Sequence, residues 1–294
     1  MGGDDAAAAR RRAKGRSGAV EAFFRTDGES APLLVVYHVQ KTAGTSLRHV
    51  VRANLPPAEA EMVSYLHKSA RTPPELLAWH EQWYRSLDAD RRSRLCCVMS
   101  HWAGYLLPVL DRPVDALVLV REPVDRTLSY YWFKQRRRGP ERLLEPLERL
   151  YEHHGTRSDG QKRPELWEQL CNWQSRALLS VFHDVSTLSH SHGPGPDADL
   201  WRRRLRELVE RVFYVGVQDR FVQYLELLER RYGWRTFVPH SKVNAARSAG
   251  QVSPALRGTI LAHNWLDLEL YELCRAAQLE REQVLEEPMR SRRR

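Results

Sequence analysis

The chain has 294 residues, of which 42% are hydrophobic and 28% charged, and its formal net charge is +9 at pH 7. This size and hydrophobic content suit one large globular domain and exclude an intrinsically disordered chain. Nine basic residues against two aspartates lie in residues 1–16 and 290–294, so the folded part keeps only about +2, which argues against nucleic acid or membrane as a partner.

The sequence predicts a cytoplasmic protein with reduced thiols. The N-terminal arginines precede no apolar segment, so we expect no export signal, and no run approaches the ~18 apolar residues of a membrane span. The four cysteines show no C-x-x-C spacing and include an adjacent pair, which favours free thiols over disulfides. They are Cys96, Cys97, Cys171 and Cys274.

We expect a disordered basic tail over residues 1–30, a single domain over 31–285 and a basic C-terminal tail over 286–294. Four apolar segments separated by helical patterns predict a P-loop-like three-layer α/β/α fold, with a central, mostly parallel sheet covered on both faces. The expected strands are Leu33–Val39, Leu95–Ser100, Ala116–Val120 and Val212–Val217.

The segment 134–206 is expected to be a helical cap over the sheet edge, with helices around Glu141–His153 and Pro164–Phe182. Within it, Gly and Pro predict a surface loop that contains His190 and His192. Because no cysteine or carboxylate cluster stands at ligand spacing, a solvated loop is favoured there over a metal site.

Polar residues follow each expected strand, and ligands of open parallel sheets bind at the carboxyl ends of the strands. Gln40 and Lys41 follow the first strand, His101 the second, Arg121 the third and Gln218–Arg220 the fourth. Lys, His and Arg at one edge predict a positively charged site for a phosphorylated or sulfated ligand.

The first turn, QKTAGTS, predicts a phosphate cradle. Ala43 and Gly44 keep the loop small enough for backbone N–H groups to face an anion, and Thr45 and Ser46 place hydroxyls where a helix begins. The loop lacks the first glycine of G-x-x-x-x-G-K-[ST], so a nucleoside-triphosphatase loop fits poorly and Mg²⁺ is not required. A turn that only permits close packing is the alternative.

The third strand leads into REPVDRTLSYYWF, where Pro123 suits the first position of a helix. Ser129 follows Arg121 by eight residues, or about 12 Å of helix axis, so the two could grip one phosphate. The alternative for Arg121 is a surface ion pair with Glu122 or Asp125. For the four aromatic residues after Ser129 the alternative is core packing, which we expect for at least half.

His101 lies in SHWAGY, directly after an apolar strand. Such a histidine is by itself more often structural than catalytic. Beside an anion cradle, however, a neutral imidazole with an unperturbed pKa of ~6.5 can remove a hydroxyl proton, so we expect a general base. His38, His49, His67 and His80 lack this setting and are expected to be structural or exposed.

These segments together resemble the carbohydrate sulfotransferases that use 3′-phosphoadenosine-5′-phosphosulfate (PAPS), especially the heparan sulfate 2-O- and 6-O-sulfotransferase group. HVQKTAGTSLRHVV resembles their 5′-phosphosulfate loop and VLVREPVDRTLSYYWF their 3′-phosphate segment, while SHWAGY stands where they carry the catalytic histidine. FYVGVQDRFVQYLELLERRYGW resembles their penultimate strand and helix. The resemblance spans roughly Leu33 to Asn244 and implies a soluble, bacterial-type member.

The resemblance implies roles for single residues. Lys41 would contact the bridging oxygen and the 5′-phosphate as a catalytic residue, and His101 would deprotonate the acceptor hydroxyl for in-line attack on sulfur. Arg121 and Ser129 would bind the 3′-phosphate. The family uses neither a metal nor a covalent intermediate. The rest of the loop would complete the donor site, namely Gln40, Thr42, Ala43, Gly44, Thr45 and Ser46.

The family also has a late basic loop, for which His240–Ser248 is the expected segment. Lys242 and Arg247 would be its anion contacts, and a solvated turn is an equal alternative. The family's vertebrate members are membrane-anchored Golgi proteins, so neither compartment nor acceptor is carried over.

The sequence thus predicts a sulfotransferase that acts on a hydroxyl of a carbohydrate or other small-molecule acceptor. One alternative is a P-loop-type nucleotide-dependent phosphotransferase, for which Asp219 would have to hold Mg²⁺. Another is a non-enzymatic polyanion-binding protein, which rests on the tails and on Lys134 and Arg136–Arg138, where a solvated helix end is the plainer explanation. The oligomeric state and the adenine contacts are left open.

Overall fold

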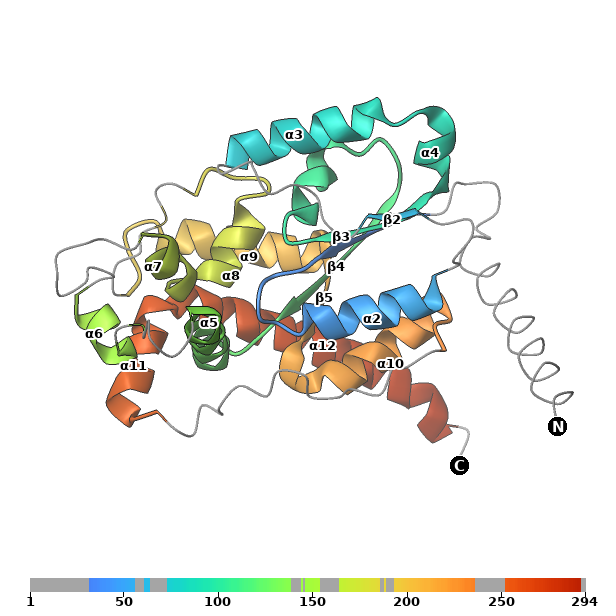
Figure 1. Ribbon diagram of the computed structural model, residues 1–294. Helices are drawn as coiled ribbons and strands as arrows, with labels where there is room; N and C mark the ends of the chain where they lie inside the picture. Colours follow the sequence, from blue (N-terminus) through green and yellow to red (C-terminus); the bar gives the residue numbers. More distant parts are fainter. Residues whose placement is uncertain are drawn as a thin grey trace, which may run out of the picture.

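The computed structural model describes residues 32–55, 61–63, 73–138, 144, 146–153, 164–185, 188, 193–235 and 252–291. They form a parallel five-stranded sheet with helices on both faces, which confirms the expected three-layer α/β/α fold (Figure 1). The strand order is β2-β3-β1-β4-β5. The strands are β1 (Leu33–Tyr37), β2 (Glu61–Val63), β3 (Leu95–Ser100), β4 (Val114–Val120) and β5 (Phe213–Val217).

The central strand β1 is buried on both faces, which explains its unbroken apolar sequence LLVVY. Side chains alternate along a strand, so Leu34 and Val36 enter one core layer while Leu33 and Val35 enter the other. β1 pairs with β3 on one side and with β4 on the other. The first loop of the chain therefore leaves the middle of the sheet.

One face of the sheet is covered by α2 (Gly44–Asn54) and α10 (Phe221–Tyr232), which lie together below the sheet in Figure 1. Helical spacing puts Leu47, Val50 and Val51 on the inner side of α2, where they are buried with the core residues of α10. This packing fixes the start of α2 against the end of β1.

The other face is covered by two groups of helices. Near β1 and β3 lie α3 (Pro73–Ser86) and the 3₁₀ helix η1 (Ala103–Val109), with α4 (Ala89–Arg94) leading into β3. Near β4 and β5 lie three further helices: α8 (Trp173–Leu179), α9 (Ala198–Arg211) and α12 (Trp265–Ser291).

A separate helical group lies at one end of the sheet, on the opposite side of the picture from α4 (Figure 1). It consists of α5 (Pro123–Arg138), α6 (Leu147–Glu152), α7 (Pro164–Leu170) and α11 (Pro254–His263), which share a hydrophobic core. The expected cap over 134–206 is therefore divided, because α6 and α7 join this group whereas α8 and α9 cover the sheet.

Several expected boundaries differ from the structure: β1 ends at Tyr37 rather than Val39, and β4 begins at Val114 rather than Ala116. The helical pattern of Pro164–Phe182 is broken at Asn172, whose left-handed φ of 44° separates α7 from α8. Residues 286–291, expected in the C-terminal tail, continue α12. The predicted contacts Lys242 and Arg247, together with His67, His190, His192 and residues 1–31, lie outside the described residues. Within the described residues, no helix has the length and apolar character that crossing a membrane requires.

Candidate functional site

The strand order places a topological switch point at the carboxyl end of β1. Because the chain continues from β3 to β4 across β1, the loops on the two sides of β1 diverge, and ligands of open sheets bind at such a point. Here Nδ1 of His101 lies 2.6 Å from the carbonyl oxygen of His38, and Nη1 of Arg121 lies 3.5 Å from that of Lys41. The structure thus brings the first loop, His101 and Arg121 together, as the sequence predicts.

The loop Gln40–Ser46 is tightly wound. Lys41 and Ala43 have left-handed φ values of 72° and 65°, and α2 begins directly afterwards at Gly44. Each left-handed non-glycine residue costs roughly 1–2 kcal/mol, so the surrounding contacts must hold the loop in this form. Such a turn leaves successive N–H groups, including those at the start of α2, on a concave side that suits an anion.

The loop side chains take different parts in this structure. The Thr42 hydroxyl, which is 1% exposed, donates to the carbonyl oxygen of Val39 over 2.9 Å and so holds the turn closed. Thr45 is exposed and Ser46 half-buried at the first turn of α2. The hydroxyls of Thr45 and Ser46 are therefore better placed for a ligand than that of Thr42.

Two arginines bind the outer side of the loop through its carbonyl groups. Nε of Arg126 donates to the oxygen of Gln40 at 3.3 Å, next to the contact between Arg121 and Lys41. Arg126 is 1% exposed and also donates to the backbone and side-chain oxygens of Gln169. Burial lowers the pKa of Arg126 to about 10. These contacts hold the loop in place through the carbonyl oxygens of Gln40 and Lys41.

The backbone of Arg121 is fixed by two hydrogen bonds to the side chain of Gln174. Its N–H donates to Oε1 of Gln174 and its carbonyl accepts from Nε2 of the same side chain, both over 2.8 Å. Gln174 is itself fully buried, and its backbone N–H donates to the buried carboxylate of Asp267 over 3.1 Å. The end of β4 is therefore fixed to α8 and α12, and the Arg121 side chain begins from a rigid point.

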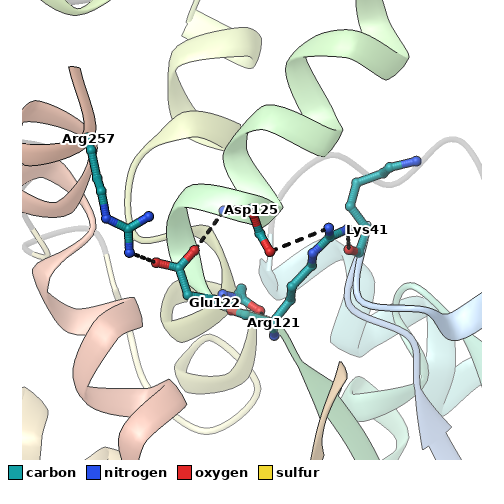
Figure 2. Close-up of polar contacts among 6 residues, drawn as sticks. Lys41, Arg121, Glu122, Asp125 and Arg257 are labelled. Atoms are coloured by element: carbon teal, nitrogen blue, oxygen red, sulfur yellow. Dashed lines mark hydrogen bonds and ion pairs between the residues drawn. The ribbon is translucent and has the colours of Figure 1, made fainter. Parts of the chain in front are cut away.

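The guanidinium of Arg121 keeps capacity for a ligand. Its ion pair with Asp125 is long, at 3.8 Å, so the expected alternative is present only in a weak form (Figure 2). Nε is buried and has no hydrogen-bond partner among the described residues. Burial lowers the pKa of Arg121, although Asp125, Glu122 and Asp219 act in the opposite direction. The side chain as a whole is 19% exposed, so an anion can reach part of it from outside, although not the buried Nε.

Both carboxylate oxygens of Glu122 accept hydrogen bonds from groups other than Arg121. Oε2 accepts from the backbone N–H of Asp125 over 2.8 Å at the start of α5, and Oε1 accepts from Nη2 of Arg257 over 3.0 Å (Figure 2). This carboxylate therefore caps α5 and joins it to α11. Among the described residues, Arg121 is left with its long ion pair of 3.8 Å to Asp125.

The Lys41 side chain points away from Arg121, as Figure 2 shows. Its Nζ lies 4.5 Å from the centroid of the Phe133 ring on α5. Burial lowers the pKa of Lys41, and the nearby positive charges of Arg136, Arg121 and Arg126 lower it further. A polyanion bound here would relieve this repulsion between like charges.

Ser129 and its neighbours lie mainly inside the protein. Ser129 is 3% exposed on α5, and Tyr130 and Tyr131 are 3% and 7% exposed, which confirms core packing for half of the aromatic run. The Arg121 guanidinium contacts Lys41 and Asp125. Burial makes Ser129 a weaker candidate for phosphate contact than Arg121.

His101 is held in the form that a general base requires. A carbonyl oxygen can only accept a hydrogen bond, so Nδ1 carries the proton in the 2.6 Å contact with His38, and Nε2 keeps its lone pair in the neutral ring. Burial lowers the pKa of His101 below its ordinary value of 6.5. The ring is therefore neutral at neutral pH.

The ring of His38 lies beside that of His101; this histidine was expected to be structural or exposed, and it is half-buried. Its ring lies 4.3 Å from that of His101, measured between centroids, and directly against the backbone of Gly44. His80 fits the expectation, since it is fully buried and its Nδ1 contacts the Leu76 oxygen at 2.6 Å, and His49 is exposed. The expected strand Leu33–Val39 included His38, whereas β1 ends at Tyr37, so the sequence did not place His38 at the end of the strand.

The end of β5 contributes less than expected. Arg220 forms an ion pair with Glu282 of α12, and the hydroxyl of Tyr271, also on α12, bonds with Asp219. These two residues of the 3₁₀ helix η2 (Gln218–Arg220) thus bind α12. Asp219 still acts on Arg121 through its charge.

Comparisons with known proteins add no family. Neither a scan against protein-family models nor a search of curated proteins finds a match to this chain.

All four cysteines are buried and free. In the part of the chain that the structure describes, no three His, Cys, Asp or Glu side chains are grouped so as to hold a metal ion.

Proposed function

We propose that this chain is a sulfotransferase that takes PAPS as donor and transfers its sulfuryl group to a hydroxyl of a carbohydrate or other small molecule. The observation that supports this most is the meeting of three groups at one sheet edge. They are the tight anion loop Gln40–Ser46, the guanidinium of Arg121 beside the backbone of Lys41, and a neutral histidine, His101, with its Nε2 lone pair available.

The site residues fit an anionic nucleotide donor. Burial and neighbouring cations lower the pKa of Lys41, and the Arg121 side chain, which is 19% exposed, has only a long ion pair of 3.8 Å to Asp125 among the described residues. In the proposal the loop holds the 5′ end of the donor and Arg121 the 3′-phosphate. Ser129 is a weaker partner because of its burial, and Lys242 and Arg247 stay predictions.

The donor brings an activated sulfuryl group, and adenosine 3′,5′-bisphosphate leaves after transfer. This chain would supply a proton acceptor at Nε2 of His101 and positive charge from Lys41 near the oxygen that becomes negative. The proposal keeps the enzyme in the cytoplasm, in agreement with the four free, buried thiols.

The test separates binding from transfer. His101→Ala should bind adenosine 3′,5′-bisphosphate as the wild type does, while the rate of transfer falls by about 10²–10⁴-fold because the base is missing. Calorimetry measures the first quantity, and mass spectrometry of hydroxyl acceptors incubated with PAPS measures the second. His49→Ala, at an exposed position of α2, is the matched control.

Three outcomes would contradict parts of this proposal. Transfer by His101→Ala at the wild-type rate would remove the assignment of the base. Thermal stabilisation of the wild type by ATP–Mg²⁺ but not by adenosine 3′,5′-bisphosphate would favour a phosphotransferase instead. Salt-dependent binding of polyanions without any response to nucleotides would favour the non-enzymatic alternative.

A further inference from the structure

We propose that His38 is a positioning residue that joins the anion loop to the base of the reaction. Its ring sets the position of the first turn of α2 at Gly44, and its backbone carbonyl sets the tautomer of His101. The consequence for catalysis rests on the proposed function, whereas the two contacts are observed independently of it.

The first contact is between the His38 ring and the backbone of Gly44. A Cβ atom built on Gly44 would lie 1.7 Å from Cδ2 and 2.1 Å from Nε2 of His38, far inside any real contact. The ring therefore occupies the space that a side chain at residue 44 would need. Because α2 begins at Gly44, the ring determines how closely the first N–H groups of α2 approach the end of β1.

The second contact is made by the His38 backbone. Its N–H donates to the carbonyl oxygen of Ser100 over 2.9 Å, one residue beyond the last registered pair of β1 and β3. Its own carbonyl then accepts from Nδ1 of His101 over 2.6 Å. The extended pairing of the two strands thus aims this carbonyl at the imidazole and leaves Nε2 as the basic nitrogen.

The third contact is between the two rings, whose centroids lie 4.3 Å apart at an angle of 38°. Burial, together with the positive charges of His101, Arg48 and Lys41, lowers the pKa of His38 to about 3. His38 therefore stays neutral when His101 is working. It does not compete for the acceptor's proton, and it presents no second positive charge to a protonated His101.

These contacts predict separable effects of two substitutions. His38→Ala removes the ring, so the start of α2 and the His101 ring both lose a neighbour. We expect weaker binding of adenosine 3′,5′-bisphosphate and a fall in kcat of up to about 10²-fold, the size that a 1 Å misplacement can produce. We also expect the acid limb of the pH profile to move upward, because a better-hydrated His101 regains a higher pKa.

His38→Phe provides the rescue, because it keeps a flat ring and the same backbone. It should restore most of the binding, the rate and the position of the acid limb. A residue with only a structural role would lower the melting temperature without moving that limb. His49→Ala, which changes an exposed histidine of α2, should leave all three quantities unchanged.

A measurement that does not depend on enzyme activity distinguishes the positioning role of His38 from the proposed function. Nitrogen-15 NMR of the wild type should show His101 protonated at Nδ1, and His38→Ala should raise the pKa of His101. Protonation at Nε2 in the wild type would overturn the role of the carbonyl. An unchanged His101 pKa together with unchanged nucleotide binding in His38→Ala would overturn the role of the ring. If the spectra agree but the wild type transfers no sulfuryl group, the proposed function fails while the positioning role of His38 stands.

Discussion

Replacing Gly44 by alanine should force its new methyl group into the ring of His38. The two closest ring atoms would be 1.7 and 2.1 Å from Cβ, where ordinary contact begins near 3.4 Å. The ring is flanked by His101 at 4.3 Å, which restricts its escape. Overpacking of this kind costs about 1–3 kcal/mol. Since glycine to alanine within a helix otherwise stabilises by about 0.5–1 kcal/mol, a loss of stability would itself be informative.

The assay is a double-mutant cycle followed by urea unfolding. In the His38→Ala background the methyl group has room, so Gly44→Ala should become neutral or stabilising, with a coupling free energy of about 1–3 kcal/mol. Gly258→Ala on α11 is the matched control, because a Cβ there meets nothing within 4 Å. Free energies of Gly44→Ala and His38→Ala that add within about 0.5 kcal/mol would refute the contact.

Two further predictions concern stability. Arg126→Met should lower the free energy of unfolding by about 3 kcal/mol or more, because the buried oxygens of Gln40 and Gln169 lose charged donors; a loss under about 1 kcal/mol would contradict the clamp. Acid should also weaken the fold through His38, whose pKa is about 3 in the folded chain against an ordinary 6.5. Between these two values the unfolded chain binds the additional proton, so stability falls as pH decreases, by up to about 1.4 kcal/mol per pH unit from this group. Urea unfolding from pH 7 to 4 should show a shallower slope for His38→Phe, and equal slopes would contradict the burial of this ring.

Local signals in the sequence predicted most of the sheet. The four longer strands were found because buried parallel strands are continuous apolar runs, which a single sequence displays. β2, Glu61–Val63, has three residues and depends on its pairing with β3, so it carries no pattern of its own. The continuation of α12 to Ser291 was likewise missed, because the basic residues there resemble a solvated tail.

The rule that ligands bind at the carboxyl ends of parallel strands predicted which site residues meet. It requires only that the strands be parallel, and so Lys41, His101 and Arg121 could be grouped before the strand order was known. Arg126 and His38 were not found by this rule. Their roles come from partners far away in the chain, Gln169 for Arg126 and His101 for His38, which are 43 and 63 residues distant.

Burial also changed the ranking of the phosphate contacts. The spacing of Arg121 and Ser129 predicted equal partners, but spacing along a helix does not tell which side faces the core. Ser129 is 3% exposed, while the Arg121 side chain is 19% exposed and begins at the carboxyl end of β4. The 3′-phosphate assignment therefore depends on Arg121.

Recognition of a 3′-phosphate is the central claim, and nucleotide discrimination tests it most directly. Calorimetry should show that the wild type binds adenosine 3′,5′-bisphosphate at least about 10-fold more tightly than adenosine 5′-monophosphate, since a charge-assisted contact contributes about 1.5–3 kcal/mol. Arg121→Ala should bind the two nucleotides equally, while Arg203→Ala, at an exposed position of α9, should discriminate as the wild type does. Equal affinity of the wild type for both nucleotides, or undiminished discrimination by Arg121→Ala, would contradict the account.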